Sequence, residues 1–211
     1  MTDIWRFIDT GLCTASYNMA LDEAIATAVK RGNSPPTLRL YGWDRPSVSV
    51  GYFQNVCDID SDYCIKKGIP IVRRPTGGRA ILHDGEITYS FSVKTDTGVF
   101  SKGLLDSYKK ISKAFGLALL KIGLASELKL QRESHRNRSP LCFQTTSYGE
   151  ITINNKKVIG SAQKRWPDGL LQQGSIPFTP ETLAVRIRQV LRSLPPLMGD
   201  SPGGSSPRIS N

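Results

Sequence analysis

Short apolar segments, each closed by a turn, are the feature of this sequence that most restricts its fold. Alternating or apolar runs of roughly four to eight residues end at glycine, proline, asparagine or aspartate, a pattern typical of short strands. We predict strands at residues 4–9, 37–41, 47–51, 69–73, 80–83, 86–93, 148–154, 157–162 and 170–176. Residues 42–46 are predicted to form the turn between the second and third strands.

Helical patterns are fewer than strand patterns. We predict helices at residues 16–30, 58–67, 104–122 and 180–194, the first three ending at a glycine and the last capped by Thr179. The pair Asp84-Gly85 predicts one hairpin, and residues 154–156 predict another. Because strands outnumber helices and several pair as hairpins, we predict an α/β fold of the α+β type with a mixed, largely antiparallel sheet.

The length of 211 residues favours a single domain, which we place at residues 1–194. Residues 195–211 are rich in proline, glycine and serine, so we predict a disordered tail there. The sequence has no apolar run near the roughly 20 residues of a membrane span, and its N-terminus does not resemble a signal peptide. We therefore expect a cytoplasmic protein that does not bind membranes.

The four cysteines have no CxxC spacing and the sequence has only two histidines, so no metal site is expected. Charge is unevenly distributed: residues 1–100 carry 11 basic and 11 acidic side chains, whereas residues 101–211 carry 17 and 7. A one-sided basic field suits an acidic partner, either a nucleic acid or an acidic carrier protein, although it could also be a solvated surface.

The segment from Arg73 to Asp84, RRPTGGRAILHD, is the densest candidate site. A Gly-Gly pair lets the backbone approach a ligand closely, and the three arginines beside it, Arg73, Arg74 and Arg79, suit a carboxylate or phosphate. His83 could be a general base or simply a hydrogen-bonded residue at the end of a strand.

Two further segments contain candidate catalytic residues. Cys142 follows a basic loop, where a nearby cation would favour its thiolate, although a buried, unreactive cysteine is the alternative. Lys157 begins a strand that continues as Gly160-Ser161-Ala162, whose small side chains leave room for a ligand. A lysine directed into such a cleft can polarise a carbonyl group.

Taken together, these segments resemble the biotin/lipoate A/B protein ligase superfamily. The matching stretches are residues 18–24, 49–55, 73–84 and 157–163, in the order of the family and spanning about residues 5–178. Thr76 and Arg79 at the variable positions of the Gly-Gly loop, and a Cys-Phe pair at Cys142, look most like the cysteine-dependent octanoyltransferases of this superfamily. The resemblance implies a biotin/lipoate protein ligase-like catalytic domain.

The resemblance also implies residue roles. Cys142 would be the nucleophile and Lys157 would orient the acyl carbonyl and the incoming amine. The residues that would bind substrate are Arg73, Arg74, Thr76, Gly77, Gly78, Arg79, Ala80, His83, Gly160, Ser161 and Ala162.

The implied reaction moves octanoyl from acyl carrier protein to a lysine of a lipoyl carrier domain, through a thioester on Cys142. The lipoyl domain would belong to the glycine cleavage H protein or a dehydrogenase E2 subunit. No cofactor is expected, because the acyl donor carries phosphopantetheine, and a monomer without a nucleic-acid partner is expected. The alternatives are an ATP-dependent lipoate–protein ligase, an amidotransferase between lipoyl domains, and a non-catalytic acyl- or carrier-binding protein.

Overall fold

The computed structural model describes residues 4–96, 98–129, 150–154, 156–176 and 209–210. Its helices are α1 (Ala15–Lys30), α2 (Ser61–Lys66) and α3 (Leu104–Lys121), with short 3-10 turns η1 (Val56–Asp58) and η2 (Gly98–Phe100). Its strands are β1 (Trp5–Cys13), β2 (Thr37–Trp43), β3 (Ser47–Val50), β4 (Ile71–Arg73), β5 (Ile81–His83), β6 (Ile87–Lys94), β7 (Glu127–Lys129), β8 (Glu150–Ile153), β9 (Lys156–Arg165), β10 (Gly169–Ile176) and β11 (Ile209–Ser210).

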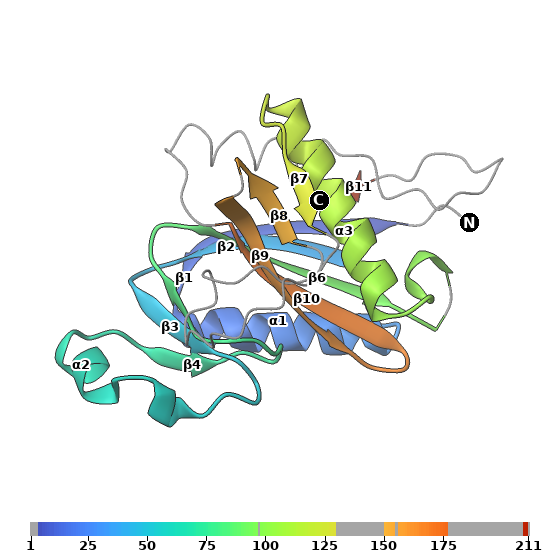
Figure 1. Cartoon of the computed structure of the whole chain (residues 1–211). Coiled ribbons are helices and arrows are strands. Elements are labelled where there is room, and N and C mark those ends of the chain that lie inside the picture. The colour runs from blue at the N-terminus through green and yellow to red at the C-terminus, as the bar shows by residue number, and fades with distance from the viewer. Residues whose placement is uncertain (1–3, 97, 130–149, 155, 177–208, 211) are drawn as a thin grey trace.

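The described strands form two sheets (Figure 1). The large sheet has the order β11-β1-β2-β6-β10-β9-β8-β7, and the small sheet has the order β4-β3-β5. Parallel pairing is confined to β11-β1-β2 in the large sheet and β3-β4 in the small one, and the other pairs are antiparallel. The predicted mixed, largely antiparallel α+β fold is confirmed.

Two of the predicted turns connect different sheets. The hairpin predicted at Asp84-Gly85 is wrong, because β5 pairs with β3 in the small sheet whereas β6 pairs with β2 and β10 in the large one. Since β2 and β10 occupy both edges of β6, β5 cannot pair with β6. The turn, in which Gly85 has φ 71°, instead directs the chain from the small sheet to the large one. Residues 42–46 likewise carry the chain from one sheet to the other.

The second predicted hairpin is confirmed. Strands β8 and β9 pair in antiparallel fashion, and Asn154 adopts the left-handed φ of 50° that asparagine tolerates in a tight turn. The helix predicted at 180–194 lies outside the described residues, as does most of the tail predicted at 195–211. The domain boundary at residue 194 therefore stays a prediction.

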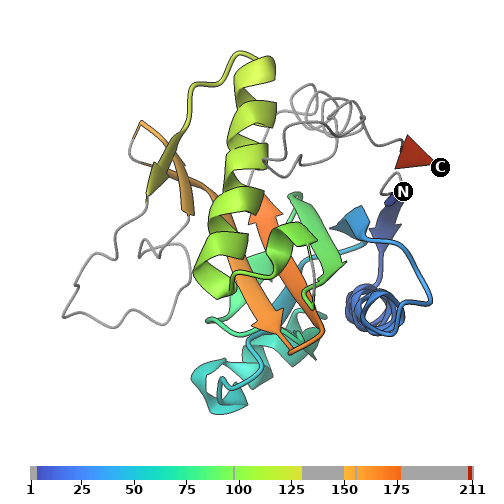
Figure 2. The ribbon, with the colours of Figure 1, turned by 90° about the vertical axis from the view of Figure 1, so that its right-hand side faces the viewer.

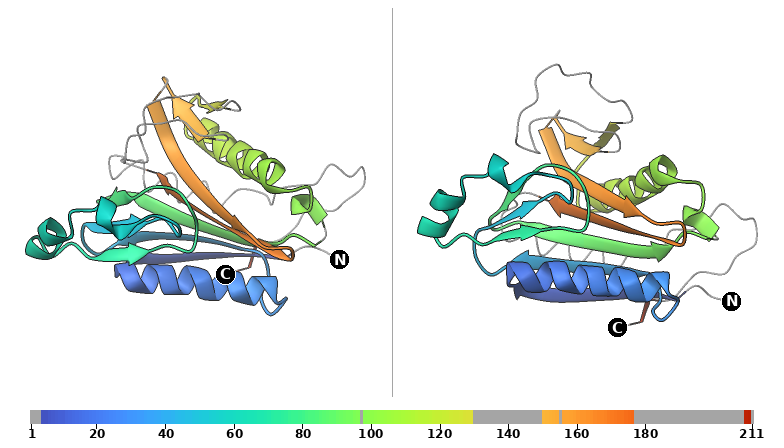
Figure 3. Two further views of the ribbon diagram at one scale, coloured as in Figure 1. Left: turned by 60° about the horizontal axis from the view of Figure 1, so that its bottom comes forward. Right: turned by 90° about the horizontal axis from the view of Figure 1, so that it is seen from below.

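Helices α1 and α3 cover opposite faces of the large sheet (Figure 3). Alternation along the strands produces the two faces, because successive side chains of a strand point in opposite directions. Tyr89 and Phe91 of β6 pack with α3 around Phe115 in the main core, whereas Ser90 bonds to Asp22 of α1. Figure 2, which views α1 end-on, shows α3 on the other side of the strands.

The small sheet has its own core of Val48, Val50, Cys64 and Ala80. It approaches the large sheet at the Gly-Gly loop, where a Cβ atom on Gly78 would lie 3.9 Å from the Cβ of Ala162 on β9. Within the small sheet, a Cβ atom on Gly51 would lie 1.9 Å from the carbonyl oxygen of Gly78. Only glycine fits at position 51 without moving the loop. None of the helices in the described part of the chain has the length and apolar character to span a bilayer.

Candidate active site

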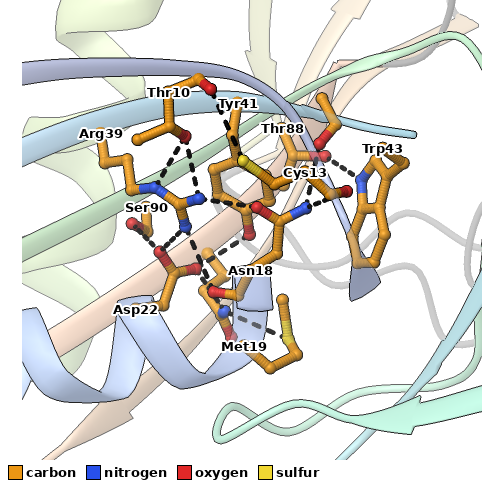
Figure 4. Close-up of polar contacts among 12 residues, drawn as sticks. Thr10, Cys13, Asn18, Met19, Asp22, Arg39, Tyr41, Trp43, Thr88 and Ser90 are labelled. Carbon is orange, nitrogen blue, oxygen red and sulfur yellow. Dashed lines mark hydrogen bonds and ion pairs between the residues drawn. The ribbon is translucent and has the colours of Figure 1, made fainter. Parts of the chain in front are cut away.

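A buried polar network on the α1 side of the large sheet supports the candidate site (Figure 4). Asp22 and Arg39 are both fully buried and form an ion pair of 2.7 Å between Oδ1 and Nη1. Asp22 also accepts hydrogen bonds from Tyr41, Ser90 and Gln173, at 2.8, 2.6 and 2.7 Å. A buried carboxylate with this many donors is well compensated for its loss of water.

This network holds side chains that face the site. Burial, followed by the negative charge of Asp22, raises the pKa of Tyr41 well above its usual value, so Tyr41 is a neutral donor to Asp22. Gln173 donates to Asp22 through Nε2 and accepts from the hydroxyl of Thr76 through Oε1, at 2.8 Å. The buried carboxylate of α1 is thus connected through β10 to the Gly-Gly loop.

A cavity of about 100 Å³ lies between the small sheet and strands β9 and β10. It is lined by Met19, Tyr41, Trp43, Ser49, Arg74, Gly78, Ile81, His83, Thr88, Gly160, Ser161, Ala162, Gln173, Gly174 and Ser175. The lining combines small residues of β9 and β10 with aromatic rings and a few polar groups, as in ordinary small-molecule sites. Of the residues predicted to bind substrate, six line this cavity: Arg74, Gly78, His83, Gly160, Ser161 and Ala162.

The Gly-Gly loop is stabilised from within by Arg74. This buried guanidinium donates to the carbonyl oxygens of Ser49, Gly77 and Arg79 at 2.7–3.1 Å, and to the hydroxyl of Ser49 at 3.0 Å. Gly78 has φ 93°, and a Cβ atom there would lie 3.9 Å from the Cβ of Ala162 on β9. The loop therefore faces β9 directly, as the sequence motifs predict for two walls of one pocket.

The other predicted loop residues lie outside the cavity lining. Arg73 uses Nη1 to donate to the carbonyl oxygens of Gly51, Tyr52 and Gln54 at 2.7–2.9 Å, which fixes the turn after β3. Nη1 of Arg79 is buried and has no hydrogen-bond partner among the described residues. Thr76 is held by Gln173, Gly77 accepts from Arg74, and Ala80 belongs to the core of the small sheet.

His83 is the centre of a hydrogen-bonded group that the sequence did not reveal in full. Its Nε2 lies 2.7 Å from the hydroxyl of Ser49, and its Nδ1 lies 2.5 Å from Oε1 of Glu86. The ring of Trp43 stacks on His83 with centroids 3.9 Å apart. Trp43 also donates to Thr88, which donates to Glu86, at 2.8 and 3.1 Å.

Ser49 and Glu86 were not identified from the sequence. A usable signal was present: Ser47 and Ser49 alternate with valines in β3, and polar residues within a buried short strand must find partners. Identifying those partners requires the pairing of β3 with β5, which brings residues 34 positions apart into contact.

The two predicted catalytic residues lie in different parts of the chain. Cys142 lies outside the described residues. Lys157 is half-buried near the start of β9, three residues before Gly160 and opposite Thr152 of β8. The register of β8 and β9 shifts at this point, since Ile151 pairs with Ile159 but Thr152 pairs with Lys157. Such a bulge redirects side chains, and bulges are frequent beside active sites.

Comparisons with known proteins agree with this geometry. Residues 14–196 match the family described as the lipoyl protein ligase A/B catalytic domain. This chain belongs to that family. Among curated members, octanoyltransferase LipM of Kyrpidia tusciae is 42% identical over 192 residues, covering 87% of this chain and 70% of the relative. Octanoyltransferase LipM of Clostridioides difficile is 46% identical, covering 82% of this chain and 65% of the relative. The chain thus spans about two thirds of the length of these lipoyl protein ligase family members.

Solved structures of the lipoyl protein ligase family share the fold. Ta0514, a putative lipoate protein ligase of T. acidophilum, superposes with a TM-score of 0.70 at 22% identity, covering 89% of this chain and 82% of that one. A lipoate-protein ligase A bound with ATP also gives a TM-score of 0.70 at 22% identity, covering 92% and 83%. At this identity the likeness concerns the fold alone.

Proposed function

We propose that this chain transfers an octanoyl group from acyl carrier protein to a lysine of a lipoyl carrier domain, through a thioester on Cys142. The observation that supports the proposal most directly is the cavity between the Gly-Gly loop and β9, in a chain more than 40% identical to proteins called octanoyltransferase LipM. The small residues from Gly160 to Ala162 leave space for an acyl chain between these two walls.

Two chemical steps make up the proposed reaction. The Cys142 thiolate attacks the thioester carbonyl of the donor, and the phosphopantetheine thiol leaves. Exchange between two thioesters changes little free energy, so this step does not need ATP. The lysine amine then attacks the acyl-enzyme and forms an amide, which is more stable than the thioester and makes the second step favourable.

Lys157 and the backbone of the Gly-Gly loop would stabilise both steps. A tetrahedral oxyanion forms each time, and donors held in place before the reaction stabilise such a charge most effectively. We assign this role to Lys157 and to backbone N–H groups of the Gly-Gly loop. The excess of basic residues in 101–211, 17 against 7, would attract acidic carrier domains such as the H protein or an E2 lipoyl domain.

The deciding experiment is intact-protein mass spectrometry after incubation with octanoyl acyl carrier protein and no ATP. We expect a single octanoyl adduct that hydroxylamine removes and that Cys142→Ser abolishes, while Cys57→Ser, at an exposed cysteine, retains it. A chain that gains no adduct but attaches free octanoate or lipoate to a lipoyl domain with ATP would instead be a ligase. If octanoylated H protein is a better donor than acyl carrier protein, the activity is amidotransfer between lipoyl domains.

A further inference from the structure

Three side chains next to the cavity form a continuous line of hydrogen bonds. Ser49 of β3 reaches Nε2 of His83 at 2.7 Å, and Nδ1 of His83 reaches Glu86 at 2.5 Å. Exposed fractions are 1% for Ser49, 3% for His83 and 9% for Glu86. Hydroxyl, imidazole and carboxylate thus follow one another in the order found in serine hydrolase triads.

The surrounding groups fix the direction of these hydrogen bonds. A carboxylate only accepts, so Nδ1–H of His83 donates to Glu86, and in this tautomer Nε2 accepts the proton of the Ser49 hydroxyl. Arg74 donates to the oxygen of that hydroxyl at 3.0 Å, which leaves its proton available for His83. Thr88 donates to the same carboxylate oxygen of Glu86 at 3.1 Å, which keeps the carboxylate in place.

The outer end of this line is open to a ligand. Ser49 and His83 both line the cavity, whereas Glu86 does not. A hydroxyl oxygen has two lone pairs, and among the described residues Arg74 uses only one of those on Ser49. Among the described residues, Glu86 is bonded to Nδ1 of His83 and Arg74 reaches the ring through Ser49. Trp43 covers one face of the ring, and Tyr41 lines the same cavity.

We propose that Ser49, His83 and Glu86 form a proton relay that deprotonates the acceptor amine in the second step of transfer. This inference rests on the proposed function, because it needs a lysine amine facing an acyl-enzyme. The amine donates a proton to Ser49 as the hydroxyl of Ser49 passes its own to Nε2 of His83, and Glu86 stabilises the imidazolium. Ser49 touches the substrate in this scheme, so it is a catalytic residue, whereas Glu86 is a positioning residue.

Atoms and charges balance over the step. The acceptor enters as an ammonium group with three protons, and the C–N bond forms while the C–S bond to Cys142 breaks with its electron pair on sulfur. The amide nitrogen retains one proton. Another passes through Ser49 to Nε2 of His83 before the amine attacks and is then released to solvent, and the third goes to the departing sulfur.

The test separates the two half-reactions. We would measure octanoyl adduct formation and then its discharge to a lipoyl domain, for the native chain and for Ser49→Ala. The relay predicts adduct formation within about twofold of native and discharge slower by on the order of 100-fold, the lower range of general-base effects. Ser47→Ala is the matched control, because Ser47 is equally buried on β3 but its hydroxyl bonds to the carbonyl of Arg45.

Raising the pH distinguishes proton transfer from a structural defect. A lysine amine loses its own proton in alkaline solution, so the deficit of Ser49→Ala should shrink between pH 7 and 9.5, whereas a distorted cavity would slow discharge equally throughout. Glu86→Gln, which retains the shape of Glu86, should also slow discharge at pH 7, and its rate deficit should also shrink towards pH 9.5. This variant replaces Ser49→Ala in the test if Ser49→Ala does not fold.

Each remaining outcome counts against the relay. Discharge by Ser49→Ala at the native rate, or a deficit that does not change with pH, overturns the relay alone. A native chain that forms no adduct overturns the proposed function, and the relay with it.

Discussion

Replacing Asp22 by asparagine tests the buried network that supports the cavity. The change keeps the shape of the side chain but removes the charge that pairs with Arg39 at 2.7 Å. Arg39 retains only neutral acceptors among the described residues, on Thr10 and Asn18, so a buried positive charge loses its counter-ion. The new amide also points a donor at side chains that are themselves donors, such as Tyr41 and Gln173.

The expected loss is large because both partners are fully buried. Breaking one side of a buried ion pair costs about 3–5 kcal/mol. For a protein of this size that corresponds to a fall in Tm of roughly 6–20 °C. Thermal and urea unfolding followed by circular dichroism would measure the change. Adding Arg39→Met should recover part of the loss, because it removes the uncompensated charge.

Asp106→Asn is the matched control for Asp22→Asn. Asp106 pairs with Lys110 one turn away on α3 at 2.6 Å, with both side chains about 30% exposed. Losing a pair of this type, together with a charge at a helix N-terminus, should cost no more than about 1 kcal/mol. If Asp22→Asn were no more destabilising than Asp106→Asn, the assignment of Asp22–Arg39 as the main support of the cavity would be refuted.

Three further predictions concern the Gly-Gly loop, Tyr89 and the turn after β3. Gly51→Ala places a Cβ atom 1.9 Å from the carbonyl oxygen of Gly78. We therefore expect the unfolding free energy to fall by about 1–3 kcal/mol and octanoyl adduct formation to be at least tenfold slower. An unchanged rate of adduct formation would contradict the close approach of Gly51 to Gly78. Burial raises the pKa of Tyr89 to about 12; the native state therefore holds this proton more tightly than the unfolded chain, and the resulting stability is complete below pH 10 and lost as pH rises to 12. Tyr89→Phe should reduce the slope of unfolding free energy against pH in this window by up to about 1.4 kcal/mol per pH unit, and an unaltered slope would exclude Tyr89 as the cause. Arg73→Ala frees three carbonyl groups of the turn and should speed chymotrypsin cleavage after Phe53, which is 90% exposed, several-fold; equal cleavage of the native chain would show that Arg73 does not stabilise the turn.

Local patterns predicted the elements of this fold well. The apolar periodicity of residues 16–30 and 104–122 identified α1 and α3 to within one residue at each end, because a helix is formed by contacts between near neighbours. The strand at 170–176 was predicted for a similar reason, since its run of residues is bounded by turns. The arginine-flanked Gly-Gly segment and the small residues after Lys157 marked six of the residues that line the cavity, and the resemblance added their role in substrate binding.

Long-range pairing was beyond the reach of the same patterns. Asp84-Gly85 has the composition of a hairpin turn, yet its flanks pair with strands more distant in sequence, so the local preference is overridden by the sheets. Ser49 and Glu86 were not predicted as site residues, because their role depends on contacts with His83 that local sequence does not show. The network of Asp22 with Arg39 and Gln173 joins residues up to 151 positions apart, which no local spacing could indicate.

Because the chain passes from the large sheet to the small one and back, the small-sheet segment can vary in sequence without changing the large sheet. Residues between Trp43 and Ile87 leave the large sheet and return at one seam, where Trp43 stacks on His83 and bonds to Thr88. Everything beyond that seam, including η1 and α2, behaves as an appended module that forms one wall of the cavity. Insertions or deletions in its outer turns could reshape the mouth of the pocket for a different carrier domain without altering the register of β2, β6 and β10.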